Sequence, residues 1–474
     1  MGIILLPLFL GIVTFILKGH EHRIIRRKLL ITGALLHNAG VVTLFFVPDF
    51  FSFSPYIQVD KIGFLFLILT SFIFTLIAFY SLGYFPLKRL ETAAESGGHI
   101  FVSCMLFFLA AMTLAISTTH VGILWIAVES TTLASAPLIY YRQSKRSLEA
   151  AWKYLLICSV GIAIALLGIF FVAAASKGTG SELSLQSLTK NGMLLNKQLL
   201  RMGFILILIG FGTKMGLAPM HNWLPDAHSE APSPISALLS GALLNCAFLG
   251  VLRFYQICES AGLEAFANKL FIFFGLFSLF MAAIFITAQK DYKRLLAYSS
   301  IEHMGIIALS IGIGANFAGM LHVVAHSLTK VLLFLAAGNI LILYRTKYVS
   351  EVNGLLRTSP STGILFAIGG LAIAGAPPFL PFISEFLVLK HGLLTGHYYA
   401  MFLYLLFLGV IFVSMSKTVF RMVYGKKRDL IWGELPKTMF VPLAAAAAAI
   451  VMLGIYLPEK VALLIETAGQ ALKI

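Results

Sequence analysis

The feature that most constrains this chain is a succession of apolar blocks separated by short stretches rich in charged residues, proline or glycine. Of its 474 residues, 59% are hydrophobic and only 12% are charged, whereas soluble proteins carry roughly 25% charged residues. A water-soluble fold is therefore excluded. The sequence predicts an all-α integral membrane protein in the cell (inner) membrane, which it crosses many times.

The apolar blocks can be counted as spans, because a helix needs about 20 apolar residues to cross a bilayer. The count predicts about fourteen transmembrane helices, the first beginning at the N-terminus. We expect a surface loop near residues 176–199 and a short tail after the last span. The predicted spans are 1–17, 29–48, 61–83, 99–117, 119–140, 153–175, 200–221, 234–255, 269–288, 294–313, 317–344, 361–390, 399–422 and 438–457.

The formal net charge of +15 comes from basic residues that lie between the apolar blocks, so it does not indicate nucleic-acid binding. Most of these residues follow odd-numbered spans. Because positive charge is retained on the cytoplasmic side, this predicts an outward-facing N-terminus. The residues are Lys18, Arg23, Arg26, Arg27, Lys28, Lys88, Arg89, Arg142, Lys145, Arg146, Lys290, Lys293, Arg294, Arg345, Lys347, Arg357, Lys426, Lys427, Arg428 and Lys437.

Several ionisable residues fall inside the predicted spans, where each costs at least about 2.5 to 3.5 kcal/mol on insertion scales. Any one of these residues could have a purely structural role. A series of them instead favours a row that moves a cation, most simply H+. We expect Glu129 to be the carboxylate that faces Lys214. The predicted proton-transfer residues are Glu129, Lys214, His322, His326, Lys330 and Glu385.

Three of these residues form a ladder on the predicted eleventh span. His322, His326 and Lys330 are spaced i, i+4 and i+8, which stacks them on one helix face over about 12 Å of rise. Histidine titrates near neutral pH, and burial moves the pKa of lysine towards neutral pH. The ladder therefore predicts a proton relay through one or two waters.

Two spans are interrupted. Gly216 and Pro219 follow Lys214, and a cluster of Gly375, Pro377, Pro378 and Pro381 precedes Glu385. Ordinary kinks are the alternative, but broken helices at corresponding places indicate inverted repeats. The predicted division is 1–98 for helices 1–3, 99–255 for the first repeat (helices 4–8), 256–422 for the second repeat (helices 9–13), and 423–474 for helix 14 and the tail.

Further polar residues near these spans are weaker relay candidates. The segment HNWLPDAHSEAPSPISALL predicts either a proton funnel on the cytoplasmic side or a capped turn that starts span eight. Lys153 can instead extend to the membrane surface. These candidates are Lys153, His221, His228, Asn245, Glu302 and His303.

The four cysteines are dispersed, and metal ligation by His221 and His228 is only a weak alternative to the funnel or turn. No phosphate-binding loop, catalytic triad or flavin motif is present. The sequence therefore predicts no metal and no cofactor in this chain.

Two long stretches, FGTKMGLAPMHNWLPDAHSEAPSPISALLSG and DYKRLLAYSSIEHMG, resemble the proton-translocating antiporter-like family of complex I, Mrp antiporters and membrane-bound hydrogenases. The resemblance covers most of the chain. VESTTLASAPL and RSLEAAWKYLLICSVGIAIALLGI are most similar to component F of hydrogenase-4-type complexes. The resemblance implies that Glu129 pairs with Lys214, that the ladder on span eleven is a relay, and that Glu385 is the terminal acid.

One departure from the family concerns span eight, where several relatives carry a lysine or histidine and this chain has Asn245. An amide cannot accept and release a proton near neutral pH, so the link between the two halves is expected to be water.

The resemblance implies a proton-translocating membrane subunit of a redox-driven complex. The first candidate for that complex is a membrane-bound nickel-iron hydrogenase. Its partners would be other membrane subunits and soluble hydrogenase and iron–sulfur subunits, which would hold the nickel-iron and iron–sulfur centres. A Na+/H+ antiporter subunit of the Mrp type or a complex I subunit is one alternative. A membrane scaffold that transports nothing is another.

Overall fold

The protein is all helical over the residues that its computed structural model describes, which are 1–19, 21–47, 55–88, 98–426 and 435–473. Of the basic residues named above, Arg89, Lys427 and Arg428 lie outside these ranges. The first seven helices are α1 (Gly2–Ile16), α2 (Arg23–Phe46), α3 (Lys61–Lys88), α4 (Gly98–Ser117), α5 (Val121–Ile139), α6 (Lys145–Ala175) and α7 (Leu185–Lys190).

The middle of the chain contains the helices that carry most of the predicted site. These are α8 (Lys197–Met215), α9 (Trp223–Glu230), α10 (Ser233–Leu238), α11 (Leu244–Ser260), α12 (Glu264–Thr287), α13 (Tyr292–Gly312) and α14 (Asn316–Tyr344). The remaining helices are α15 (Leu355–Thr358), α16 (Pro360–Ile373), α17 (Leu380–Leu394), α18 (Tyr398–Val423), α19 (Lys437–Ile455) and α20 (Glu459–Gln470).

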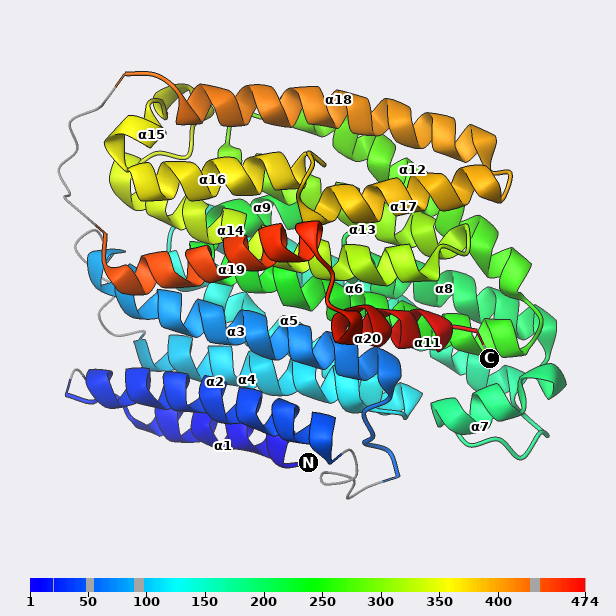
Figure 1. The fold of residues 1–474 in the computed structure, drawn as a ribbon. Coiled ribbons are helices and arrows are strands. Elements are labelled where there is room, and N and C mark those ends of the chain that lie inside the picture. The colour runs from blue at the N-terminus through cyan, green and yellow to red at the C-terminus, as the bar shows by residue number, and fades with distance from the viewer. Residues whose placement is uncertain (20, 48–54, 89–97, 427–434, 474) are drawn as a thin grey trace.

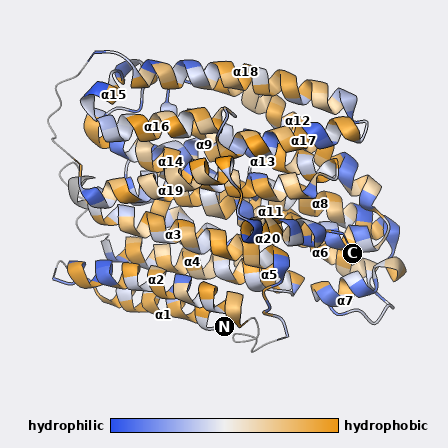
Figure 2. Cartoon of the chain, viewed as in Figure 1, coloured by the Kyte–Doolittle hydropathy of each residue, from blue (hydrophilic) through white to orange (hydrophobic). Residues whose placement is uncertain are grey.

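The long helices run side by side in one bundle, with α1 at one edge of the view and α18 at the other (Figure 1). Hydrophobic residues dominate their middles, whereas hydrophilic residues gather towards the two ends of the bundle (Figure 2). Within the described ranges, 12 helices are long and apolar enough to cross a membrane on their own. The prediction of a multi-pass, all-α membrane protein is confirmed.

The other two predicted spans correspond to the shorter helix α1 and to α16 and α17, which together form one broken span. One start differs clearly, because α6 begins at Lys145 rather than at residue 153. Ser144 caps it by accepting a hydrogen bond from the Ser147 amide at 3.0 Å, and the Ser147 hydroxyl returns the contact. This capping box starts the helix before the apolar block begins.

Both predicted helix breaks are present. Helix α8 ends at Gly216, whose φ is +86°, and the chain resumes as α9. Helix α16 is followed by Gly375, with φ +73°, before α17 begins at Leu380. A Cβ on Gly375 would lie 2.2 Å from Oε2 of Glu385. Glycine therefore gives the turn its left-handed conformation and leaves room for a buried carboxyl group.

Small residues bring two pairs of helices into close contact. A Cβ on Gly168 of α6 would lie 2.8 Å from the Gly203 carbonyl oxygen of α8. In the same way, a Cβ on Gly275 of α12 would lie 2.8 Å from the Gly305 carbonyl oxygen of α13. Such small-residue contacts are the usual means by which membrane helices approach closely. They hold α8 and α13, which carry Lys214 and His303, against their neighbours.

The eighth span is interrupted by one π-helical turn, η5 (Leu239–Leu243), between α10 and α11. All five of its residues are buried. A π turn widens the backbone spiral and frees carbonyl groups from the regular α-helical pattern, often at functional sites. The turn lies immediately before Asn245.

Candidate functional site

The N-terminal half of the predicted row is a hydrogen-bonded chain of Lys214, Thr132 and Glu129. Lys214 Nζ donates to Thr132 Oγ1 at 2.7 Å, and Thr132 Oγ1 donates to Glu129 Oε2 at 3.2 Å. Lys214 and Thr132 are fully buried, whereas Glu129 is half-buried. Among the described residues, no ion pair joins Glu129 and Lys214 directly, so the hydroxyl of Thr132 stands between the acid and the base.

Further hydroxyl groups surround this chain. Lys214 Nζ also donates to the Tyr154 hydroxyl at 2.7 Å, and that hydroxyl lies 2.6 Å from Ser135 Oγ. Ser159 Oγ donates to Glu129 Oε1 at 2.7 Å. The buried ammonium is thus surrounded by neutral oxygen atoms from α5 and α6, which compensate for its removal from water.

Asn245 lies where the two halves meet, on the first turn of α11. Its Nδ2 donates to the Gly241 carbonyl oxygen of the π turn at 2.9 Å and to Ser327 Oγ of α14 at 2.6 Å. Its Oδ1 is buried and has no hydrogen-bond partner among the described residues. An acceptor of this kind can hold a water molecule where space allows.

Lys330 and His326 of α14 contact two other helices. Lys330 Nζ donates to the Leu296 carbonyl oxygen at 2.9 Å and to Ser299 Oγ, both on α13. The ring nitrogen Nε2 of His326 lies 3.3 Å from the Ser240 carbonyl oxygen in the π turn. All of these groups are buried.

His303 of α13 lies between the two histidines of α14. Its ring centroid is 4.9 Å from that of His322 and 5.4 Å from that of His326. Its Nδ1 lies 2.7 Å from His322 Nε2, within direct hydrogen-bonding distance. The sequence predicted a relay along one face of the eleventh span. The structure shows this extra imidazole, from a second helix, beside both members of that face.

The far end of the row is formed by α17. His322 Nδ1 lies 2.8 Å from Ser384 Oγ, and the neighbouring residue is Glu385. Glu385 is 8% exposed, and its Oε1 has no hydrogen-bond partner in the described part of the chain. Glu302 of α13 is 1% exposed and likewise has an unpartnered Oε2. Two buried carboxyl groups with free oxygen atoms are costly unless protons or water reach them.

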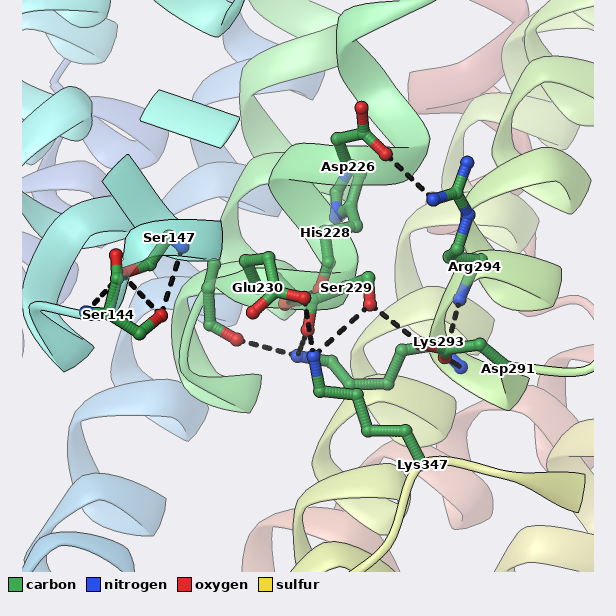
Figure 3. Close-up of polar contacts among 12 residues, drawn as sticks. Ser144, Ser147, Asp226, His228, Ser229, Glu230, Asp291, Lys293, Arg294 and Lys347 are labelled. Carbon is green, nitrogen blue, oxygen red and sulfur yellow. Dashed lines mark hydrogen bonds and ion pairs between the residues drawn. The ribbon is translucent and has the colours of Figure 1, made fainter. Parts of the chain in front are cut away.

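The predicted funnel segment around α9 is held in place by ion pairs (Figure 3). Asp226 Oδ1 lies 2.8 Å from Arg294 Nη1, and Asp226 Oδ2 lies 3.1 Å from Lys153 Nζ. Lys153 also pairs with Glu149 at 2.6 Å. The ammonium group of Lys153 thus binds two carboxylates, an arrangement that anchors α9 to α6.

A second pair anchors the other end of α9, where Lys347 Nζ lies 2.8 Å from Glu230 Oε1 (Figure 3). Burial favours the neutral form of Glu230, but the hydrogen bond and charge of Lys347 outweigh it and hold the pKa of Glu230 below its usual value. At Lys347 burial wins instead, and the pKa of that ammonium is lowered. Desolvation and attraction are thus close to balance in this pair.

His221 and His228 pack against different aromatic side chains. His221 is 2% exposed and lies against the rings of Phe285 and Tyr298. His228 is fully buried and stacks on Phe334 at 5.0 Å between ring centroids. Within the described ranges, neither ring nitrogen of His228 has a hydrogen-bond partner.

The groups that sequence reasoning missed are mostly hydroxyls. Thr132 lies three residues after Glu129, and Ser384 directly precedes Glu385. A hydroxyl one turn from a buried charge, or beside one, is a usable signal. The contacts of Tyr154 and Ser299 cross between helices and leave no such signal, because they depend on how the bundle packs.

Comparison with known proteins gives the family. The membrane family described as NADH:quinone oxidoreductase/Mrp antiporter matches residues 118–425. A hydrogenase-4 component F homolog from Methylacidiphilum infernorum is 37% identical over 423 residues, which cover 86% of this chain and 87% of that protein.

Two solved structures share the fold. A chain of the membrane-bound sulfane sulfur reductase, an archaeal respiratory membrane complex, aligns with a TM-score of 0.88 at 22% identity, over 100% of this chain and 97% of that one. A chain of the Mrp complex from Dietzia sp. DQ12-45-1b aligns with a TM-score of 0.85 at 17% identity, over 99% and 96%. The protein is thus an antiporter-like membrane subunit that belongs to the NADH:quinone oxidoreductase/Mrp antiporter family.

Proposed function

We propose that this chain is the proton-translocating membrane subunit of a redox-driven complex, and that this complex is a membrane-bound nickel-iron hydrogenase. In this proposal H+ moves along the buried row. The observation that carries the proposal is the unbroken hydrogen-bonded chain from Lys214 through Thr132 to Glu129. A half-buried acid and a buried base joined in this way have a direct means of exchanging a proton.

The first half can work as a two-state pair. In one state Lys214 is an ammonium and Glu129 a carboxylate. Lys214 passes a proton to Thr132 Oγ1 while the threonine passes its own proton to Glu129 Oε2, which leaves a neutral amine and a neutral acid. The hydroxyl ends as it began, because it gains one proton and loses one.

The second half can pass protons between imidazole rings and a carboxyl group. His303 and His322 lie within hydrogen-bonding distance, and His322 contacts Ser384 beside Glu385. The ring centroid of His326 lies 5.4 Å from that of His303. Lys330 lies one helical turn after His326 on α14. Water beside Asn245 would connect this series with Lys214, since the amide itself cannot carry a proton.

The redox chemistry would belong to partner subunits. The similarity to a hydrogenase-4 component F homolog supports nickel-iron and iron–sulfur centres in soluble subunits that bind the membrane arm. The proposal places no cofactor in this chain.

The test of the complex is mass spectrometry of the native assembly, solubilised in detergent and isolated through a tag on this chain. Nickel-iron hydrogenase and iron–sulfur subunits in the isolate are the expected result. An isolate that contains only small membrane subunits would contradict the redox-driven complex.

The family match also favours a second candidate, a Na+/H+ antiporter subunit of the Mrp type. It would use the same acid–base pair without any redox partner. Sodium-dependent proton movement in vesicles whose complex contains no metal-cluster subunit would decide for it. A complex I-type assembly would instead show NADH dehydrogenase subunits in the isolate, and a pure scaffold would tolerate charge-removing substitutions along the row without loss of transport.

A further inference from the structure

Three buried side chains at the far end of the row meet closely enough to hold one metal ion. His303, His322 and Glu385 each offer a ligand atom, and these atoms all lie within 4.8 Å of one another. They come from α13, α14 and α17, so the sequence alone gave no ligand spacing that would indicate a site. Glu385 Oε1 has no hydrogen-bond partner among the residues that the structure describes, so it can offer a lone pair to an ion.

The hydrogen bonds around His322 prepare one of its nitrogens as a ligand. Ser384 Oγ donates its proton to the Pro381 carbonyl oxygen at 2.8 Å. With that proton donated to the carbonyl oxygen, Ser384 Oγ can accept from His322 Nδ1 at 2.8 Å, and in this assignment the ring proton lies on Nδ1 and the lone pair on Nε2. A histidine whose second nitrogen is held by an oxygen in this way is the usual arrangement for a metal ligand.

The geometry requires only a small adjustment. Nδ1 of His303 and Nε2 of His322 are 2.7 Å apart, whereas two nitrogens on a tetrahedral Zn2+ are about 3.3 Å apart, given Zn–N bonds of about 2.0 to 2.1 Å. The rings would have to separate by about 0.6 Å, and the proton between them would leave as the ion arrives.

We propose that His303, His322 and Glu385 form a binding site for one divalent transition-metal ion with the preferences of Zn2+, and that the bound ion stops proton passage. Two imidazoles and one carboxylate suit Zn2+, with water in the fourth position. Mg2+ and Ca2+ prefer oxygen ligands alone and should not bind. The claim that the ion stops proton passage rests on the proposed function, because the ion would occupy the groups that carry the proton. The claim that the ion binds does not depend on that function.

A cavity lies about one helical turn of α14 away from His322. It has a volume of about 450 Å³ and lies at the ends of α13, α14, α17 and α20. Its lining includes Ala318, His391 and Glu466. Ala318 lies four residues before His322, which is one helical turn on the same face and about 6 Å of rise. An ion in the cavity would thus be about one turn away from its ligands.

Binding can be tested on the isolated native complex after removal of metal by a chelator. We expect one equivalent of Zn2+ by equilibrium dialysis, no competition from Mg2+, and an X-ray absorption spectrum with two imidazole nitrogens and light-atom ligands at about 2.0 to 2.1 Å. His322→Gln and Glu385→Gln should each weaken binding at least about tenfold. His37→Gln is the matched control, because His37 is a buried, doubly hydrogen-bonded histidine on α2.

The outcomes separate the two claims. A spectrum without imidazole ligands, or equal Zn2+ affinity in the wild type and His322→Gln, would overturn the site. The wild-type spectrum requires no variant, so it tests the site even if a substitution prevents folding. Site-specific Zn2+ binding in a complex that moves no protons would support the metal site and contradict only the proposed function. Proton transport unaffected by saturating Zn2+ would overturn the claim that the ion stops proton passage.

Discussion

A single hydroxyl separates Lys214 from Glu129, whereas two further imidazoles lie between His326 and Glu385. The hydroxyl cannot hold an extra proton near neutral pH, so the first half can only exchange a proton between its acid and its base in one concerted movement. An imidazole has a second ring nitrogen on which it can take up a proton. Under the proposed function, α5 and α8 would thus carry an acid–base switch, and α13, α14 and α17 a series of groups that pass the proton on one after another.

The largest effect on this comparison is expected from His303→Gln. It removes the imidazole that lies beside both His322 and His326, and proton transport by the complex in vesicles should fall at least about tenfold. His37→Gln, a buried histidine bonded to Ser71 and Thr113 away from the row, should transport nearly as the wild type does. Equal transport in both variants would mean that the second half does not run through His303.

Thr132→Val tests the switch, because valine keeps the shape of threonine but removes the bridging hydroxyl. Transport should fall about tenfold, as expected for the loss of one acid–base step. Thr131→Val is the control, since that buried hydroxyl donates only to the Val128 carbonyl oxygen of its own helix, at 2.6 Å. If the two variants cannot be told apart, the Lys214 and Glu129 pair exchanges protons by another route.

Asn245 tests how the two halves are joined, with an effect of a few-fold. Asn245→Ala leaves room for water beside Ser327, whereas Asn245→Leu fills that room with apolar atoms. Transport should therefore be lower in the leucine variant than in the alanine variant. The reverse order would contradict a water link between the halves.

The smallest effect on transport is expected from Glu230→Gln, which lies outside the row. Losing the charge opposite Lys347 should leave transport unchanged and lower stability by about 1 kcal/mol. Because the folded-state pKa of Glu230 is lowered, its contribution is present above its usual pKa of about 4.3 and is lost as the pH falls through the folded value. Thermal unfolding of the two proteins should thus converge only when the pH falls below the folded-state pKa of Glu230. A large transport defect in Glu230→Gln would indicate that the ion pairs of α9 are part of the proton path.

Much of this arrangement can be predicted from the sequence. Apolar block length sets the spans, and glycine followed by proline marks the breaks after Lys214 and before Glu385. The buried charges stand out because an apolar span tolerates few of them. These signals are local, and each is visible within a window of about twenty residues.

The connections between helices could not be predicted in the same way. That Tyr154 contacts Lys214, or that His303 lies between two histidines of α14, depends on the register in which neighbouring helices pack. The π turn before Asn245 depends on packing as well, since Leu239–Leu243 carries no residue that demands it. Sequence reasoning also misjudged the start of α6, where a serine capping box extends the helix beyond the apolar block.

The most direct test of the account is the number of protons moved per electron transferred in inside-out vesicles that carry the native complex with Lys214→Ala. Lys197→Ala, an exposed position at the start of the same helix, is the control. The account predicts that the lysine at the switch is needed, so proton movement should be lost in Lys214→Ala while the complex still assembles and the control pumps normally. An unchanged ratio of protons to electrons in Lys214→Ala would contradict the account.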